Sequence, residues 1–167
     1  GVYASVGGGS VDAASLAVSA ESTVTAENRV GALGASLGVG VGGSFGYTGL
    51  YGTTQADIAG TTVASNSVDV TARAGNGNGP AAMAESYVGG IGLVGLGAGV
   101  AIARVDQRVG ASAGGTFNGN GGHLNIGATD ESEAQAHAYG GTAGGAGGGG
   151  GVAAAAETSG AIASLAG

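Results

Sequence analysis

The sequence predicts an all-β protein with a repetitive, β-solenoid-like or layered β-sheet architecture built from Gly- and Ala-rich strands. Glycine supplies 41 of 167 residues, and the hydrophobic fraction of 43% is mostly Ala and Val, so the core must be thin. Many segments alternate with a period of two, which is typical of β-strands. Short motifs also recur in the same order, which indicates an internal repeat.

The repeat is anchored on an alanine that recurs with a spacing of about 52 residues. The four anchors are Ala4, Ala56, Ala111 and Ala161. They divide a single elongated repeat region, residues 1–167, into about three units. The approximate units are 4–55, 56–110 and 111–160, with a partial unit at 161–167.

Two further strands are expected within each unit. The copies of the first are LAVSA at 16–20, VDVTA at 68–72 and LNIGA at 124–128. Their first, third and fifth residues would point inward, because successive strand residues alternate between two faces. The copies of the second lead into Gly-rich arms and are TAENRVG at 25–31, MAESYVG at 83–89 and QAHAYGG at 135–141.

The first Gly-rich arm, residues 31–47, has one bulky face and one almost bare face. Odd positions such as Leu33, Val41 and Phe45 are bulky, whereas the even positions are all Gly, Ala or Ser. Glycine weakens a strand unless another backbone approaches closely. We therefore expect a second backbone against the bare face and a conventional core against the bulky face. In the second arm the bulky residues change parity, which predicts a bulge or tight turn at 93–95.

Turns between strands are predicted by Asn-Gly pairs, because both residues tolerate positive φ. The pairs begin at Asn76, Asn78, Asn118 and Asn120. Helix is disfavoured throughout. The run at 153–157 is flanked by glycine, and each Gly costs a helix about 1 kcal/mol relative to Ala.

The composition argues against several classes of protein. Lysine is absent, the only basic residues besides histidine are four arginines, and the net charge is −7, so the basic patch of a nucleic-acid-binding protein is missing. The chain has no cysteine, which excludes disulfides and thiolate metal sites. No apolar run free of frequent glycine is long enough for a transmembrane helix.

Sites for chemistry are weakly supported. Residues 38–43 and 90–95 match G-x-G-x-x-G, but a dinucleotide site needs a following helix, and the residues after Gly95 alternate like a strand. His123 and His137 flank three acidic residues without a zinc signature, and 119–126 only faintly resembles a Ca²⁺-binding nonapeptide. We assign no catalytic, cofactor-binding or metal residue and expect no enzyme, with a metal or Ca²⁺ site as the alternative.

Two groups of polar and aromatic residues have less specific interpretations. Arg104, Asp106 and Arg108 share one parity, which predicts a small ion-pair ladder on one strand face. The tyrosines recur near arm ends, and we favour packing at the core edge over contacts to carbohydrate or protein. These tyrosines are Tyr3, Tyr47, Tyr51, Tyr87 and Tyr139.

The order of elements resembles the repeats of large secreted bacterial filamentous adhesins, including the leukotoxin-type filamentous adhesin family. The residues that carry the resemblance are a Gly/Val alternating arm, the segment TQADI at 54–58, a turn, and VDVTA at 68–72. The resemblance covers nearly the whole chain. It implies a secreted, elongated β-solenoid or related repetitive β architecture at the cell surface.

The sequence therefore predicts a structural or adhesive repeat segment of a secreted bacterial surface or filament-forming protein. Its location would be extracellular or at the bacterial cell surface, and it would act by sheet stacking and strand pairing. Expected partners are neighbouring repeats or other copies of itself, and a host-cell or biofilm-matrix surface. No nucleic acid, small-molecule substrate or cofactor is expected. The alternatives are a self-assembling extracellular fibre subunit without an adhesive ligand, and an outer-membrane β-barrel. Parallel coils and long antiparallel hairpins both fit the pattern.

Overall fold

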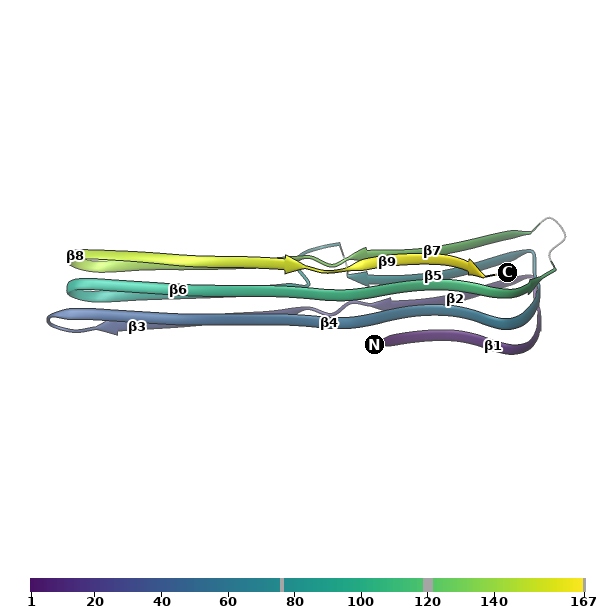
Figure 1. The fold of residues 1–167 in the computed structure, drawn as a ribbon, viewed down its shortest axis with the longest axis horizontal. Helices are drawn as coiled ribbons and strands as arrows, with labels where there is room; N and C mark the ends of the chain where they lie inside the picture. Colours follow the sequence, from purple (N-terminus) through teal and green to yellow (C-terminus); the bar gives the residue numbers. More distant parts are fainter. Residues whose placement is uncertain (76, 119–121, 167) are drawn as a thin grey trace.

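The computed structural model describes residues 1–75, 77–118 and 122–166, and within these ranges the protein is all β, without a helix (Figure 1). Every strand pairing there is parallel, so the long antiparallel hairpins do not occur. The strands are β1 (Val2–Asp12), β2 (Ser15–Ser22), β3 (Ala26–Ala35), β4 (Val39–Ala64), β5 (Ser67–Gly75), β6 (Ala82–Phe117), β7 (His123–Glu131), β8 (Ala134–Glu157) and β9 (Gly160–Ala166).

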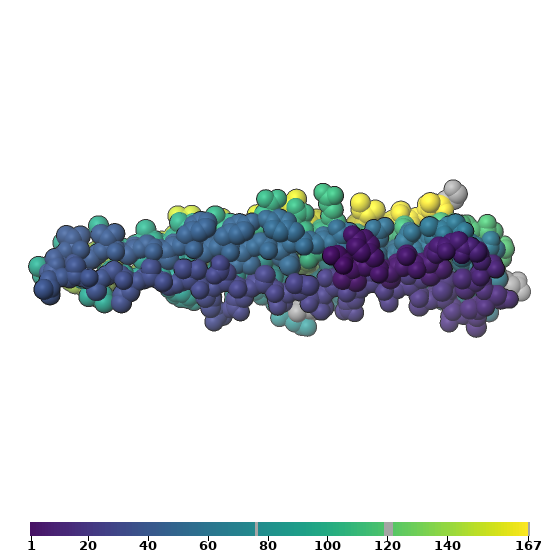
Figure 2. Space-filling model, turned by 90° about the horizontal axis from the view of Figure 1, so that it is seen from below, coloured from purple at the N-terminus to yellow at the C-terminus, as the bar shows by residue number. Residues whose placement is uncertain are grey.

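The chain winds in long, flat turns, which we call coils, and the coils stack on one another (Figure 1). One sheet has the order β1-β4-β6-β3, with β8 and β9 also paired to β6, and a second sheet has the order β2-β5-β7. We call the end that holds β1, β2, β5, β7 and β9 the base. The other end, the arm, holds β3 and β8 with residues 39–51 of β4 and 82–105 of β6. Viewed along the stacking direction, the molecule is a long, narrow slab (Figure 2).

Each coil reverses direction at the tip of the arm. The ladder between β3 and β6 ends at Ala35 and Ile91, and the ladder between β4 and β6 begins at Val39 and Val94. A Cβ on Gly90 would lie 2.7 Å from the backbone of Leu96, so the outgoing and returning legs of β6 stack directly on each other. The tight turn expected at 93–95 is confirmed.

The parallel register supports most of the motif alignment. Ala4 pairs with Ala56 and Ala56 with Ala111, and the strands at 16–20, 68–72 and 124–128 pair residue for residue. The last anchor was wrong by two residues, because Ala111 pairs with Ala163 rather than Ala161. The segment at 25–31 is also displaced by two, since Ala26 pairs with Ala82. A period-2 pattern still matches after a shift of two.

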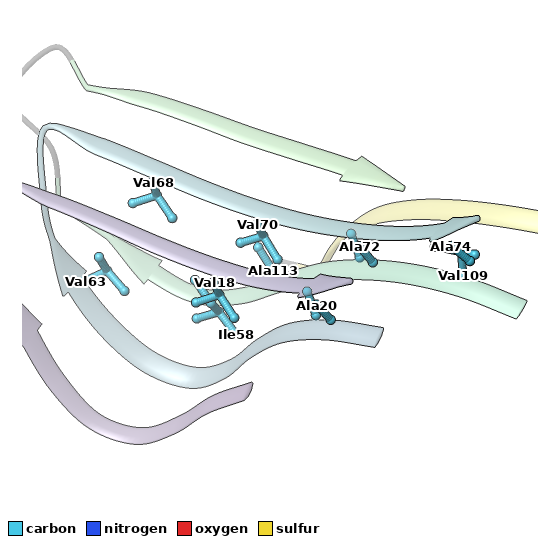
Figure 3. Packing of buried hydrophobic residues seen from close by; sticks show 12 residues of the cluster. Val18, Ala20, Ile58, Val63, Val68, Val70, Ala72, Ala74, Val109 and Ala113 are labelled. Atoms are coloured by element: carbon cyan, nitrogen blue, oxygen red, sulfur yellow. The ribbon is translucent and has the colours of Figure 1, made fainter. Parts of the chain in front are cut away.

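The space between the two layers narrows from base to tip because the inward side chains become smaller. At the base, Val and Ile share the core with Ala, around Ile58, Val63 and Val70 (Figure 3). In the middle, most inward residues are alanines, such as Ala82, Ala101 and Ala103, joined by Leu50 and Val105. Toward the tip they are mostly glycines. Sheets stack about 10 Å apart when ordinary side chains separate them, so a graded sequence gives a tapered slab.

At the base, the predicted inward positions are correct. Val18, Ala20, Val68, Val70 and Ala72 are buried. The corresponding residues Leu16, Ile126 and Ala128 are partly buried against the same core. The exception is Leu124, which is 37% exposed. It lies on β7, the last strand of its sheet.

In the arm, the glycine faces of the two layers lie against each other, as the bare face predicted. A Cβ on Gly42 would lie 2.5 Å from the carbonyl oxygen of Gly89, and one on Gly95 would lie 2.6 Å from that of Gly90. The conventional core expected on the bulky face was wrong. Leu33 is 68% exposed, Val41 67% and Phe45 60%. The bulky side chains point outward because the layers lie too close together for large side chains on both of them, and the inward Val88 packs against glycines such as Gly42 and Gly97.

Polar contacts bridge the narrow space between the layers at Ser44 and Thr48. The hydroxyls of Ser44 and Ser86 are 2.5 Å apart, and Ser86 is fully buried. The Thr48 hydroxyl donates to the carbonyl of Met83 at 2.9 Å. A small hydroxyl fits beside glycine and satisfies a buried polar group, so these residues hold the two layers in register.

The predicted turns fall partly outside the described residues. Asn76, Gly119, Asn120 and Gly121 lie there, so the pairs that include them are not described. Asn78 and Gly79 form a bend after β5. Residues 153–157 belong to β8, in line with the expectation against a helix.

Candidate functional surface

The outer faces of the arm carry most of its bulky side chains. We call one of these surfaces the front face, and it lies toward the viewer in Figure 1. It is the outer face of residues 39–51 of β4, 94–106 of β6 and 146–157 of β8. Parallel pairing places equivalent residues in columns across the coils. Phe45, Val100 and Val152 form one column, and Tyr47, Ile102 and Ala154 form the next. A flat, largely apolar surface results.

The tyrosines do not pack at the core edge, contrary to our expectation. All five are exposed, from 44% for Tyr87 to 66% for Tyr3. On the front face, the Tyr47 and Tyr51 hydroxyls are 2.6 Å apart, above Gly49. Odd residues of β4 share the outer face, so these side chains meet only because glycine stands between them.

Charged groups line the front face next to these tyrosines, toward the base. The Arg104 guanidinium lies 5.9 Å from the centre of the Tyr51 ring, a cation–π distance. Its Nη2 is 3.7 Å from Oδ2 of Asp106. The predicted ion-pair ladder is confirmed for these two residues. Exposed pairs of this kind contribute about 0–1 kcal/mol, so this one is a minor stabilising contact.

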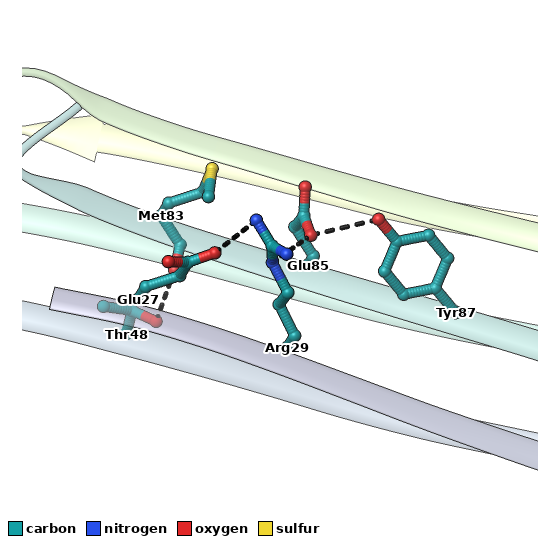
Figure 4. Close-up of polar contacts among 6 residues, drawn as sticks. All are labelled: Glu27, Arg29, Thr48, Met83, Glu85 and Tyr87. Carbon is teal, nitrogen blue, oxygen red and sulfur yellow. Dashed lines mark hydrogen bonds and ion pairs between the residues drawn. The ribbon is translucent and has the colours of Figure 1, made fainter. Parts of the chain in front are cut away.

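The opposite outer face, the back face, carries a second polar network (Figure 4). Arg29 on β3 binds Glu27 at 2.5 Å and Glu85 on β6 at 2.8 Å. The Tyr87 hydroxyl donates to Glu85 at 3.0 Å. The Tyr87 ring stacks on Tyr139 of the next coil, with centroids 5.1 Å apart. These contacts link successive coils at the surface.

A shallow depression lies beside the stacked tyrosines on the back face. Tyr87, Tyr139 and Leu33 surround bare backbone at Gly89 and Gly141, and the depression has a volume of about 510 Å³. It contains no charged side chain. Its chemistry suits an apolar or aromatic contact.

The hydrogen bond to Glu85 raises the pKa of Tyr87 above its usual value of about 10. Because the folded-state pKa is raised, this contact stabilises the fold below pH 10 and is lost as pH rises through the folded-state pKa. Glu85→Ala should lower the pKa of Tyr87 toward 10. NMR titration of labelled tyrosine checks this, with Tyr47 as the internal control. An unchanged pKa of Tyr87 in this variant would show that the hydrogen bond to Glu85 is not formed.

The glycine motifs that match a nucleotide loop are parts of strands and turns. Residues 90–95 make the reversal within β6, and 38–43 lead from the first tip into β4. A strand follows each motif instead of the helix that a dinucleotide site requires. The interpretation as Gly-faced strand with a tight turn is confirmed.

The candidate metal residues are not brought together. Glu131 binds Arg73 at 2.5 Å, and the ring of His137 lies over Tyr139. Within the described ranges, no group of three or more His, Asp or Glu side chains is arranged to hold a metal ion. The stretch at 119–126 begins outside the described residues.

Comparisons with known proteins identified no family. No family model matches the chain, and neither the curated proteins nor the solved structures contain a significant match. Among the described residues, no helix could span a membrane.

Proposed function

We propose that this chain is a structural segment of a secreted bacterial surface or filament-forming protein, located outside the cell or on its surface. Parallel coils that stack in register would form a stalk or filament wall, and exposed side chains would make any adhesive contact with a host-cell or biofilm-matrix surface. The chain would perform no catalysis and take no cofactor. Its partners would be neighbouring coils, other copies, or that surface.

The observation that carries this proposal is the open ladder at both ends of the stack. In the described part of the chain, β2 and β7 are the outer strands of the base sheet, and each is paired on one side only. Backbone groups on their free edges can pair with a further coil. Solenoids grow in this way because each coil contacts only its neighbours.

The charge distribution supports the same proposal. Residues 30–56, 86–103 and 138–156 contain no charged side chain, so the part of the arm nearer its tip is neutral, and the charges of the arm lie toward the base. The absence of lysine and the net charge of −7 disfavour nucleic acid as a partner. A neutral, flat surface over this part of the arm suits packing and surface contact.

Immunogold electron microscopy of cells that produce the protein tests this function. Antibodies against the chain should label filaments or the cell surface. Labelling confined to the cytoplasm would contradict the proposal.

In solution, small-angle scattering should give a radius of gyration of about 23 Å for a slab about 80 Å long, compared with about 15 Å for a compact chain of this length.

The second candidate is a self-assembling fibre subunit without an adhesive ligand. The same open edges support it, because separate copies could pair there. Purified chain that forms fibres at micromolar concentration, and that coats beads without making them adhere to cells or matrix, would favour this candidate.

A further inference from the structure

The front face stays uncovered however many coils the protein has. Further coils add above and below the stack, whereas the front face looks sideways, perpendicular to the stacking direction (Figure 1). Its bulky residues are well exposed, as Val39 at 60%, Val41 at 67%, Phe45 at 60%, Leu96 at 46% and Val152 at 63% show. Exposed apolar patches of this extent mark interaction sites.

We propose that the front face binds the front face of a second copy of this chain, so that two arms pack sheet against sheet. This proposal rests on the proposed function and extends it, because two stalks would pair side by side through their front faces. The occupant is argued from charge, shape and area.

Charge favours a second copy at the arm rather than the base. The net charge of −7 would make two copies repel. The front face from Val39 to Thr48 and from Val94 to Ala103 carries no charge, and charged residues begin at Arg104. Two front faces can therefore meet in an antiparallel or parallel sense without a like-charge contact across most of their length.

Shape favours a copy of the same surface. The column of Gly43, Ala98 and Gly150 is a groove between two ridges. One ridge is the column of Phe45, Val100 and Val152, and the other is formed by Val41 and Leu96 and ends at Gly148 on the third coil. Both copies repeat their side chains at the same coil spacing of about 4.8 Å, so a ridge of one copy fits the groove of the other over successive coils, as in a steric zipper.

Area sets the expected strength. Residues 39–51 on three strands cover about 43 Å by 14 Å, or roughly 600 Å² per copy. The total of about 1,200 Å² lies at the lower limit for specific interfaces. The back face is less suitable, because its uncharged stretch on β3 runs only from Val30 to Ala35 before the polar network begins at Arg29. Three coils should thus form a reversible dimer, in the range of about 1–100 µM.

Sedimentation equilibrium of the whole chain tests the proposal with a matched pair of variants. Val41→Glu places a charge on the front face, and Leu33→Glu places it at a position of equal exposure on the back face. We expect the first to raise the dimer dissociation constant at least about tenfold and the second to change it less than about twofold. Circular dichroism and thermal melts confirm that both variants fold.

Cross-linking supplies the geometry, since the chain has no cysteine of its own. Ala98→Cys on the front face should give covalent dimers rapidly with a short bis-maleimide cross-linker, because a direct disulfide could not reach across sheets about 10 Å apart, and Ala35→Cys on the back face should not. A chain that stays monomeric at 100 µM or above (about the weakest affinity expected), or that dimerises through Ala35→Cys only, overturns the proposal. So does a monomer whose front face binds neutral phospholipid vesicles instead. None of these results would change the immunogold labelling of the cell surface. The proposed function as an unpaired stalk would therefore still stand.

Discussion

Replacing Gly42 with valine is expected to lower the free energy of unfolding by about 2–4 kcal/mol. The added Cβ would lie 2.5 Å from the carbonyl oxygen of Gly89, in the opposite layer. The obstacle is backbone rather than a flexible side chain, so relief requires the two layers of the arm to separate. Urea unfolding, with hydrogen exchange of the arm amides, measures the loss.

Gly43→Val is the matched control, one residue away on the same strand. Gly43 faces outward, and the nearest atom to its Cβ would be 3.8 Å away. Because valine is favoured in strands, this change should alter stability by less than about 0.5 kcal/mol. Equal destabilisation by both variants would contradict the account of the glycine face.

Truncation of Ile58 to alanine is expected to cost about 2–5 kcal/mol, because it leaves a cavity in the base core. Ile58 is 1% exposed and packs among the buried Val and Ala side chains of β2, β5 and β6 (Figure 3). The core of the arm consists mostly of alanines, so the base supplies most of the burial of larger apolar side chains. Thermal and urea unfolding should both show the loss.

The same change at Ile162 isolates the effect of burial. Ile162 lies on β9 and is 70% exposed. Its replacement by alanine should alter stability by less than about 0.5 kcal/mol. If the two isoleucines cost the same, burial would not account for the contribution of Ile58 to stability.

Much of the fold could be predicted from period and spacing. Alternation identified strands, and recurring motifs gave the correct partners for Ala4, Ala56 and Leu16. The errors at Ala161 and at 25–31 were both shifts of two residues. Such a shift keeps every side chain on its own face, so a period-2 pattern cannot detect it.

The orientation of the arm could not be predicted from the same pattern. Alternation shows that Phe45 and Gly46 lie on opposite faces of the strand. The same alternation is compatible with either face being buried. Burial of the larger side chain is the usual outcome, and it misplaced Phe45 and the tyrosines. The deciding fact is the close approach of a second glycine face, which depends on residues such as Gly89 more than 40 positions away.

The orientation of the glycine faces is tested most directly by a disulfide between Ser44→Cys and Ser86→Cys. The two hydroxyls are 2.5 Å apart across the layers, and the rest of the chain has no cysteine. We predict rapid intramolecular disulfide formation on mild oxidation. The control pair Phe45→Cys and Tyr87→Cys points outward from opposite layers and should stay reduced and open to alkylation. An intramolecular disulfide in the control pair, with free thiols at 44 and 86, would contradict the glycine-faced arm.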